Sequence, residues 1–343
     1  MRLPVEICKL IGLRLLDLNG CSNLKDIPPN FISSLTRLEE LYLAGTSIQW
    51  EVQGRSKTCL DELKRLSHLT TLEISILHTN VLSKGLFSKK LERYNITIGP
   101  CSWDHRLRLK QHETSRKLEL NLGTSCSCFD FEDVPPKTPS VKNTLSVLDG
   151  QGFPELEQLW VQDGPCLLTV VDCFESESRD PFPSLETLVI HKILSIGREE
   201  DKIQLKELRS MTLARLPQLT VFSSASEVIL EEEVDTLTPF FNKKVAFPCL
   251  EELVIDGARE LKMIWHKQLV DESFRNIKSM TVEWCNKIVT VFQSSMVERI
   301  LRLESLTVSN CSSVEHIFNL HWADLKSHIL QYRKSTKIEV HME

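Results

Sequence analysis

The chain has 343 residues, of which 41% are hydrophobic and 26% are charged, a composition typical of a folded protein with a sizeable core. Acidic residues number 47 against 41 lysines and arginines, so the formal net charge is −6, and no basic excess exists to neutralise nucleic-acid phosphates. The apolar stretches are far shorter than the about 20 residues that cross a bilayer, and Pro4, Glu6 and Lys9 interrupt those near the N-terminus. The sequence therefore predicts no nucleic-acid partner, no membrane span and no secretory signal.

One aliphatic pattern recurs along the chain. Its first copy, with the spacing LxxLxLxxCxxLxxI, consists of Leu13, Leu16, Leu18, Cys21, Leu24 and Ile27. Weaker copies follow, and they begin near Leu38, Leu69, Tyr94, Leu118, Leu156, Leu185 and Met211. Full copies return at residues 250–264, 277–291 and 303–317. These eleven candidate units average about 31 residues, more than the usual 20–29 of such repeats, so we expect several of them to carry insertions.

The spacing has a physical cause in the alternation of side chains along a strand. In each xLxLx segment both aliphatic residues point to one side, and only stacked neighbouring strands can bury that side. The sequence therefore predicts an α/β fold: a leucine-rich-repeat solenoid, or horseshoe, with a concave parallel β-sheet and short irregular convex segments. Cys21, Cys285 and Cys311 stand just after their strands, where we expect a packing role and not a reactive one.

We expect residues 1–318 to form this solenoid and residues 319–343 to form a divergent C-terminal tail or cap, with a helix near 323–332. The aliphatic pattern becomes irregular at 123–152 and 223–246, which we interpret as surface insertions; the alternative is that Glu231, Glu232 and Glu233 dock a basic partner. Aromatic residues close four of the units, which predicts an aromatic row along the convex side: Phe222, Trp265, Phe292 and Phe318.

No pattern in the chain indicates catalysis. The motifs GxxxxGK[ST], GxSxG and HExxH do not occur, so neither a phosphate-binding loop nor a common hydrolase site is predicted. Cys126 and Cys128 form a CxC pair, but no second pair stands at a metal-ligand spacing, and the eleven cysteines are an odd number. We expect no enzyme, no cofactor and no metal site, and we expect reduced thiols in the cytoplasm or the nucleus.

The outward side chains of the predicted strands form a mildly acidic surface with isolated aromatic residues, which suits a protein or peptide partner. We expect Tyr42 and Trp160 to be its exposed anchors, although many of its other residues are also explained as solvated surface. The candidate protein-binding residues are Asp17, Glu40, Tyr42, Glu73, Arg93, Lys117, Trp160, Gln162, His191, Glu252, Asp256 and Glu283, with Asn95, Glu119 and Thr281 beside them.

The stretch from Leu3 to Ile48, the units of the form FPxLExLxI and the stretch from Phe274 to Phe318 resemble the repeat region of plant intracellular nucleotide-binding leucine-rich-repeat disease-resistance proteins of the coiled-coil class. The resemblance covers most of residues 1–318. It implies a role in innate immunity, in which this region senses a pathogen effector or a modified, guarded host protein. It also implies that the region restrains the nucleotide-binding module of its own receptor until it is triggered.

The chain departs from that family in having no phosphate-binding motif, so we assign ADP or ATP, which a full-length receptor binds through another module, to no residue here. Two alternatives remain open. A leucine-rich-repeat adaptor that presents substrates for ubiquitylation would use the same solenoid together with an F-box module. A non-functional fragment of a resistance protein would show the same repeats.

Overall fold

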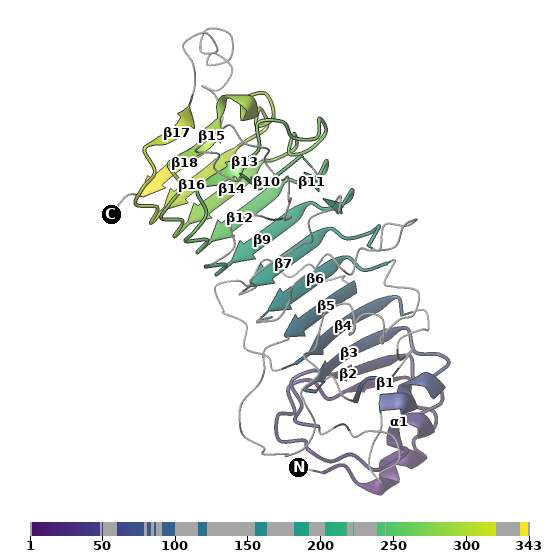
Figure 1. Cartoon of the computed structure of the whole chain (residues 1–343). Coiled ribbons are helices and arrows are strands. Elements are labelled where there is room, and N and C mark those ends of the chain that lie inside the picture. Colours follow the sequence, from purple (N-terminus) through teal and green to yellow (C-terminus); the bar gives the residue numbers. More distant parts are fainter. Residues whose placement is uncertain are drawn as a thin grey trace. The chain divides into compact units, whose positions relative to one another are not determined.

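The computed structural model describes residues 2–48, 50, 60–78, 81–83, 86, 91–99, 116–121, 155–162, 182–191, 203–217, 222, 239–243, 245–319 and 337–341. It divides into two compact units, residues 1–162 and residues 163–343, and each unit is built from parallel strands (Figure 1). Among the residues described, no helix is long and apolar enough to cross a membrane.

In the first unit, six parallel strands are hydrogen-bonded to one another in chain order. They are β1 (Leu15–Asp17), β2 (Glu40–Leu43), β3 (Thr71–Ile76), β4 (Arg93–Ile98), β5 (Arg116–Asn121) and β6 (Gln158–Gln162). The short helical segment η1 (Val5–Lys9) precedes β1, and α1 (Phe31–Ser34) and η2 (Leu60–Arg65) lie in the connections that follow β1 and β2.

In the second unit, the corresponding parallel strands are β7 (Thr187–His191), β9 (Ser210–Ala214), β12 (Glu252–Asp256), β14 (Ser279–Glu283), β16 (Ser305–Ser309) and β18 (Lys337–His341). The connections contribute three smaller parallel pairs. They are β8 (Ile203–Gln204) with β11 (Val245–Ala246), β10 (Pro239–Phe241) with β13 (Met263–Trp265), and β15 (Thr290–Gln293) with β17 (His316–Asn319). One 3-10 turn, η6 (Ser294–Met296), follows β15.

The predicted leucine-rich-repeat solenoid of parallel strands is confirmed, and each of the eleven predicted units contributes a strand to it. One strand lies beyond the predicted solenoid: β18 pairs in register with β16, in a segment that we had assigned to a divergent tail or cap. The backbone therefore continues the repeat at residues 337–341. The helix expected near 323–332 lies outside the described residues, as do the CxC pair and most of the two irregular stretches.

The core consists of aliphatic side chains that lie opposite one another on successive strands. In the second unit one such rung is Leu188, Met211, Leu253, Met280 and Leu306. All five residues are at most 2% exposed. The first unit has equivalent rungs, and one of them runs through Leu43, Ile74, Ile96, Leu118 and Leu159. The inward positions of the LxL pattern therefore form the core, as their spacing predicts.

Three of the four residues predicted for the aromatic row, Trp265, Phe292 and Phe318, form it in the second unit, but Phe241 and not Phe222 stacks on Trp265. Phe241, Trp265, Phe292 and Phe318 stack in sequence, with ring centroids 5.5, 6.2 and 5.3 Å apart. The Trp265 indole also donates a hydrogen bond to the Val291 carbonyl, at 3.0 Å. Phe222 packs edge-on against Phe240 and at a tilt against Phe241, so it contacts the stacked row through Phe241. These rings fill the interior of the connections, where small aliphatic residues would leave space.

The cysteine positions after β14 and β16 form a short ladder of thiols. The Cys285 backbone N–H donates to Cys311 Sγ at 3.4 Å, and each thiol lies 3.2 Å from the carbonyl oxygen two residues earlier. The hydrogen bond with Cys311, together with burial, raises the pKa of the Cys285 thiol. Both residues are free and buried, which agrees with a packing role.

The fully buried Leu306 allows a direct test of the repeat register. We expect Leu306→Ala to lower the free energy of unfolding by about 2–5 kcal/mol, because it removes buried methyl groups and leaves a cavity. The matched control is Leu301→Ala, since Leu301 is 50% exposed and lies in the same unit. Urea denaturation of the two variants measures the difference, and equal midpoints would contradict the assigned core.

Candidate functional site

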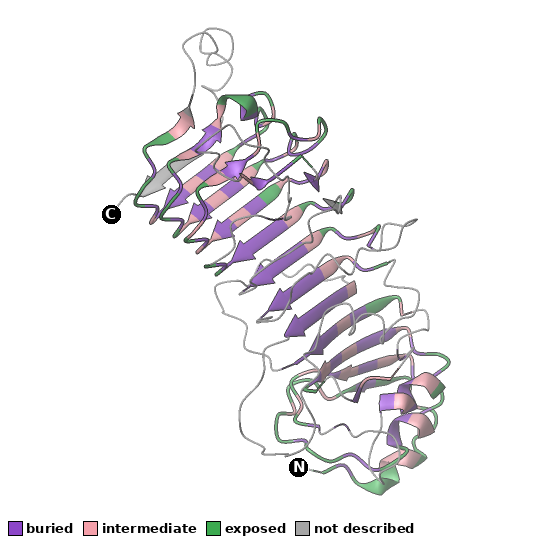
Figure 2. Ribbon diagram, in the orientation of Figure 1, coloured by how far each residue is buried: buried purple, intermediate pink, exposed green. Residues whose placement is uncertain are grey.

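The outward face is here the set of strand side chains that alternate with the aliphatic core residues. In the first unit, Asp17 and Arg93 are exposed on this face, and Glu40, Tyr42 and Glu73 are half-buried. In the second unit, Glu252 is exposed, and Asp256 and Glu283 are half-buried. Most of the predicted binding residues on β1 to β4, β12 and β14 are therefore at least partly accessible (Figure 2).

The predicted residues on β5, β6 and β7 are buried, contrary to the exposure that we expected for them. The exposed fractions are 9% for Lys117, 7% for Trp160, and 1% for both Gln162 and His191. The Lys117 ammonium group forms an ion pair with Glu119 and lies 3.9 Å from the centre of the Trp160 ring. Trp160 is thus a packed ring beneath a buried cation and not an exposed anchor, because alternation along a strand predicts a direction but not what covers it.

Seven residues of the first unit, six of them at least partly accessible, lie at neighbouring positions on or beside the outward face. We call them the Glu40–Glu73 cluster, which comprises Asn19, Glu40, Tyr42, Thr71, Glu73, Arg93 and Asn95. The Tyr42 hydroxyl donates to Glu40 Oε2 at 2.7 Å, and Arg93 Nη2 lies 3.8 Å from the same oxygen. The side-chain amides of Asn19 and Asn95 donate to the two oxygens of Glu73, at 2.9 and 3.3 Å. The structure therefore brings four predicted residues together: Glu40, Tyr42, Glu73 and Arg93.

The backbone fixes where these side chains stand. In the parallel register, Thr71 lies between Glu40 on β2 and Arg93 on β4, and Glu73 lies between Tyr42 and Asn95. The hydrogen bond to the Glu40 carboxylate raises the pKa of Tyr42, with burial adding to the effect. The Tyr42 phenol thus stays protonated and holds Glu40 in one orientation.

Asn19 is a member of the cluster that the strand pattern did not identify, because it lies in the turn after β1. Its Oδ1 accepts the Ala44 backbone N–H at 2.8 Å, while its own backbone N–H donates to Asp17 Oδ1 at 2.9 Å. Asparagine and aspartate side chains commonly bond to nearby backbone in this way. The feature of the sequence that could have identified Asn19 is its position directly after an LxL strand.

The outward face of the second unit is also acidic. Glu252, Asp256 and Glu283 are its charged members on β9, β12, β14 and β16, and within those described strands no lysine or arginine accompanies them. Glu283 accepts a hydrogen bond from the Ser309 hydroxyl at 2.9 Å, and Glu252 one from Ser210 at 3.4 Å. The neighbouring positions on these strands are mainly serine and threonine, whose side chains are short. The carboxylates therefore give this part of the face a negative charge.

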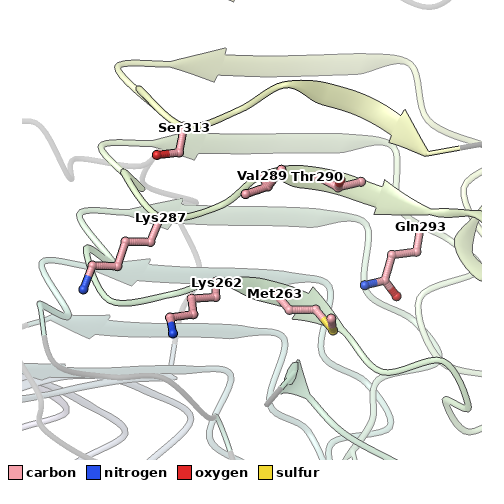
Figure 3. Close-up of a pocket in the computed structure, with 7 residues that line it drawn as sticks. All are labelled: Lys262, Met263, Lys287, Val289, Thr290, Gln293 and Ser313. Atoms are coloured by element: carbon pink, nitrogen blue, oxygen red, sulfur yellow. The ribbon is translucent and has the colours of Figure 1, made fainter. Parts of the chain in front are cut away.

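A separate depression of about 550 Å³ lies over β13 and β15 in the second unit (Figure 3). Its lining residues come from those two strands and the turns beside them: Lys262, Met263, Lys287, Val289, Thr290, Gln293 and Ser313. None of them is a predicted binding residue. One of its two lysines, Lys287, is already paired with Glu260 at 2.5 Å. The described residues contain no group of histidine, cysteine and acidic side chains able to hold a metal ion.

Comparison with known proteins agrees with these repeats. Residues 249–342 match the family model of plant disease resistance protein RPS2-like, leucine-rich repeats. The chain is also 23% identical over 284 residues to a probable disease resistance protein of Arabidopsis thaliana. The chain is therefore similar to the leucine-rich-repeat regions of plant disease-resistance proteins. That alignment covers 80% of this chain and 27% of the relative, so the chain spans about a quarter of the length of that protein.

The bond from Tyr42 to Glu40 can be tested by titration. We expect Glu40→Gln to lower the pKa of Tyr42, because the neutral amide no longer disfavours a neighbouring phenolate. Since the raised pKa stabilises the folded state only while the phenol is protonated, this contribution is lost as the pH rises above about 10, the ordinary value for tyrosine. Nuclear magnetic resonance of the tyrosine ring carbons follows the titration. A Tyr42 signal that titrates at the same pH in both proteins would contradict the hydrogen bond.

Proposed function

We propose that this chain acts without catalysis, by recognising another protein through its outward face. The observation that carries the proposal is the Glu40–Glu73 cluster, in which charged and aromatic side chains are accessible and are held in place by hydrogen bonds to one another. Preorganised side chains of this kind lose little conformational entropy when a partner binds. The fold supports the proposal, because stacked repeats present an extended surface suited to protein recognition.

We further propose that the partner is a pathogen effector, a guarded host protein or the nucleotide-binding module of the receptor to which the repeats belong. The similarity to disease-resistance proteins motivates all three. A surface that binds the resting and the active state of a switch with different affinity shifts the balance between those states, and restraint of such a switch needs nothing more. The unpaired thiols of Cys8, Cys21, Cys249, Cys285 and Cys311 support a location in the cytoplasm or the nucleus.

A graft tests the proposed recognition. The full chain replaces the repeats of a related receptor, and cell death in leaves is scored with wild-type repeats and with the double variant Glu40→Gln, Tyr42→Ala. We expect the double variant to change either triggered or basal cell death at least several-fold, because it removes a fixed carboxylate and the aromatic side chain beside it.

The matched control for the graft is Lys267→Ala with Glu272→Gln, since both residues are exposed and lie in a connection away from the outward face. The control should behave as the wild type does. Equal cell death for the wild type, the double variant and the control, at equal protein levels, would remove the recognition role from this part of the face.

A further inference from the structure

We propose that the Glu40–Glu73 cluster binds the guanidinium group of an arginine side chain on a protein partner. This inference rests on the proposed function, since it names the chemistry that the same outward face recognises. Three features of the cluster carry it: acceptors that lack donors, carboxylates held at fixed positions, and a loosely placed internal guanidinium.

The first feature is a shortage of donors. Thr71 is only 6% exposed, and its side-chain oxygen is buried without a hydrogen-bond partner among the described residues. Asn95 Oδ1 is also buried, and within the described chain it too meets no donor. Thr71 lies between Glu40 and Arg93 in the register, and Asn95 lies beside Glu73, so both oxygens belong to the cluster. Buried polar atoms that lack partners are costly, and a donor-rich ligand removes that cost.

The second feature is the fixed position of the two carboxylates. Tyr42 holds Glu40, and the amides of Asn19 and Asn95 hold Glu73, so neither side chain must be ordered when a cation arrives. Register places Tyr42 directly opposite Glu73, and Glu40 stands two residues before Tyr42 on the same strand. Tyr42 therefore has one carboxylate beside it on its own strand and the other directly opposite it on β3.

The ligand chemistry follows from that arrangement. A guanidinium group offers five N–H donors in a planar fork, enough to meet two carboxylates and the remaining acceptors, and its flat face stacks on an aromatic ring. A lysine ammonium group offers three donors from one point, so it cannot reach acceptors on two strands equally well. With Asp17 included, three carboxylates stand against the single guanidinium of Arg93, so the cluster retains negative charge for a cationic partner.

The third feature is Arg93 itself. Its Nη2 atom lies 3.8 Å from Glu40 Oε2, too far for a hydrogen bond, and 54% of its side chain is exposed. A guanidinium group thus already rests against the cluster without being fixed there. An incoming arginine displaces it at little cost, and Arg93 acts as an internal competitor for the site.

The test uses the full chain with 15N-labelled asparagine, and the probe is a capped peptide that carries one arginine between glycines. Titration is followed by the side-chain amide signals of Asn19 and Asn95. We expect saturable shifts with a dissociation constant in the millimolar range, and weakening by about tenfold or more in Glu40→Gln with Glu73→Gln. Arg93→Gln should tighten binding by about twofold or more, because the competitor is gone.

Two controls make the result specific. Glu272→Gln with Glu298→Gln removes the same charge from exposed residues in connections of the second unit, away from the outward face, and should leave the affinity unchanged. A peptide with citrulline, which keeps the shape of arginine but not its charge, should not shift the signals. Unfolding midpoints show which variants are folded. If the Glu40→Gln, Glu73→Gln double variant is unfolded, the change in affinity of Arg93→Gln still tests the proposal.

The proposal is overturned if the citrulline peptide, or a peptide with lysine in place of arginine, binds as tightly as the arginine peptide. It is also overturned if the affinity does not depend on Glu40, Glu73 and Arg93. These outcomes are separate from failure of the proposed function. If the arginine peptide binds but the substitutions of Glu40 and Tyr42 do not change cell death in the graft, the recognition role fails and the arginine site stands. If the graft responds and no arginine peptide binds, recognition stands with different chemistry.

Discussion

Alternation of side chains along a strand is the constraint on which the rest of this protein depends. Because consecutive residues point to opposite sides, the rung of Leu43, Ile74, Ile96, Leu118 and Leu159 that builds the core also dictates which residues form the outward face. A slip of one residue in β2 would bury Glu40 and Tyr42 and expose Leu41 and Leu43. The hydrophobic rungs thus hold Glu40, Tyr42 and Glu73 in place, although none of these three belongs to the core.

A second repeated feature is a residue with positive φ after several of the strands. Gly20, Gly257, Trp284 and Asn310 follow their strands with positive φ, and the first three donate their backbone N–H to a carbonyl of the next repeat. The left-handed conformation is free of steric cost for glycine but costs about 1–2 kcal/mol at Trp284. The turn is therefore imposed by the stacked repeats and not by the local sequence, since a bulky residue adopts it where its neighbours require it.

The positions of the strands and of the core residues could be predicted from the sequence, because both follow from the alternation of aliphatic and other residues in the leucine pattern. The same pattern could not identify the burial of Lys117, Trp160 and His191. Their positions on the strands were predicted correctly, but exposure depends on what packs over the strands, and alternation carries no information about that. The strand β18 was missed for a related reason: Ile338 and Val340 alternate correctly, but a single short LxL pair after an irregular stretch is weak evidence by itself.

The burial of residues on β5 and β6 bears on where the proposed recognition surface lies. Glu119 has its own cation in Lys117, and that ion pair is packed against Trp160, so its charge is already neutralised inside the chain. Glu251, directly before β12, is likewise paired with Arg209 and Lys278. Glu40 and Glu73 are held mainly by neutral donors, which fix a carboxylate without cancelling its charge. A carboxylate attracts a partner only where the chain has oriented it and has not neutralised it, and both conditions are met together at the Glu40–Glu73 cluster.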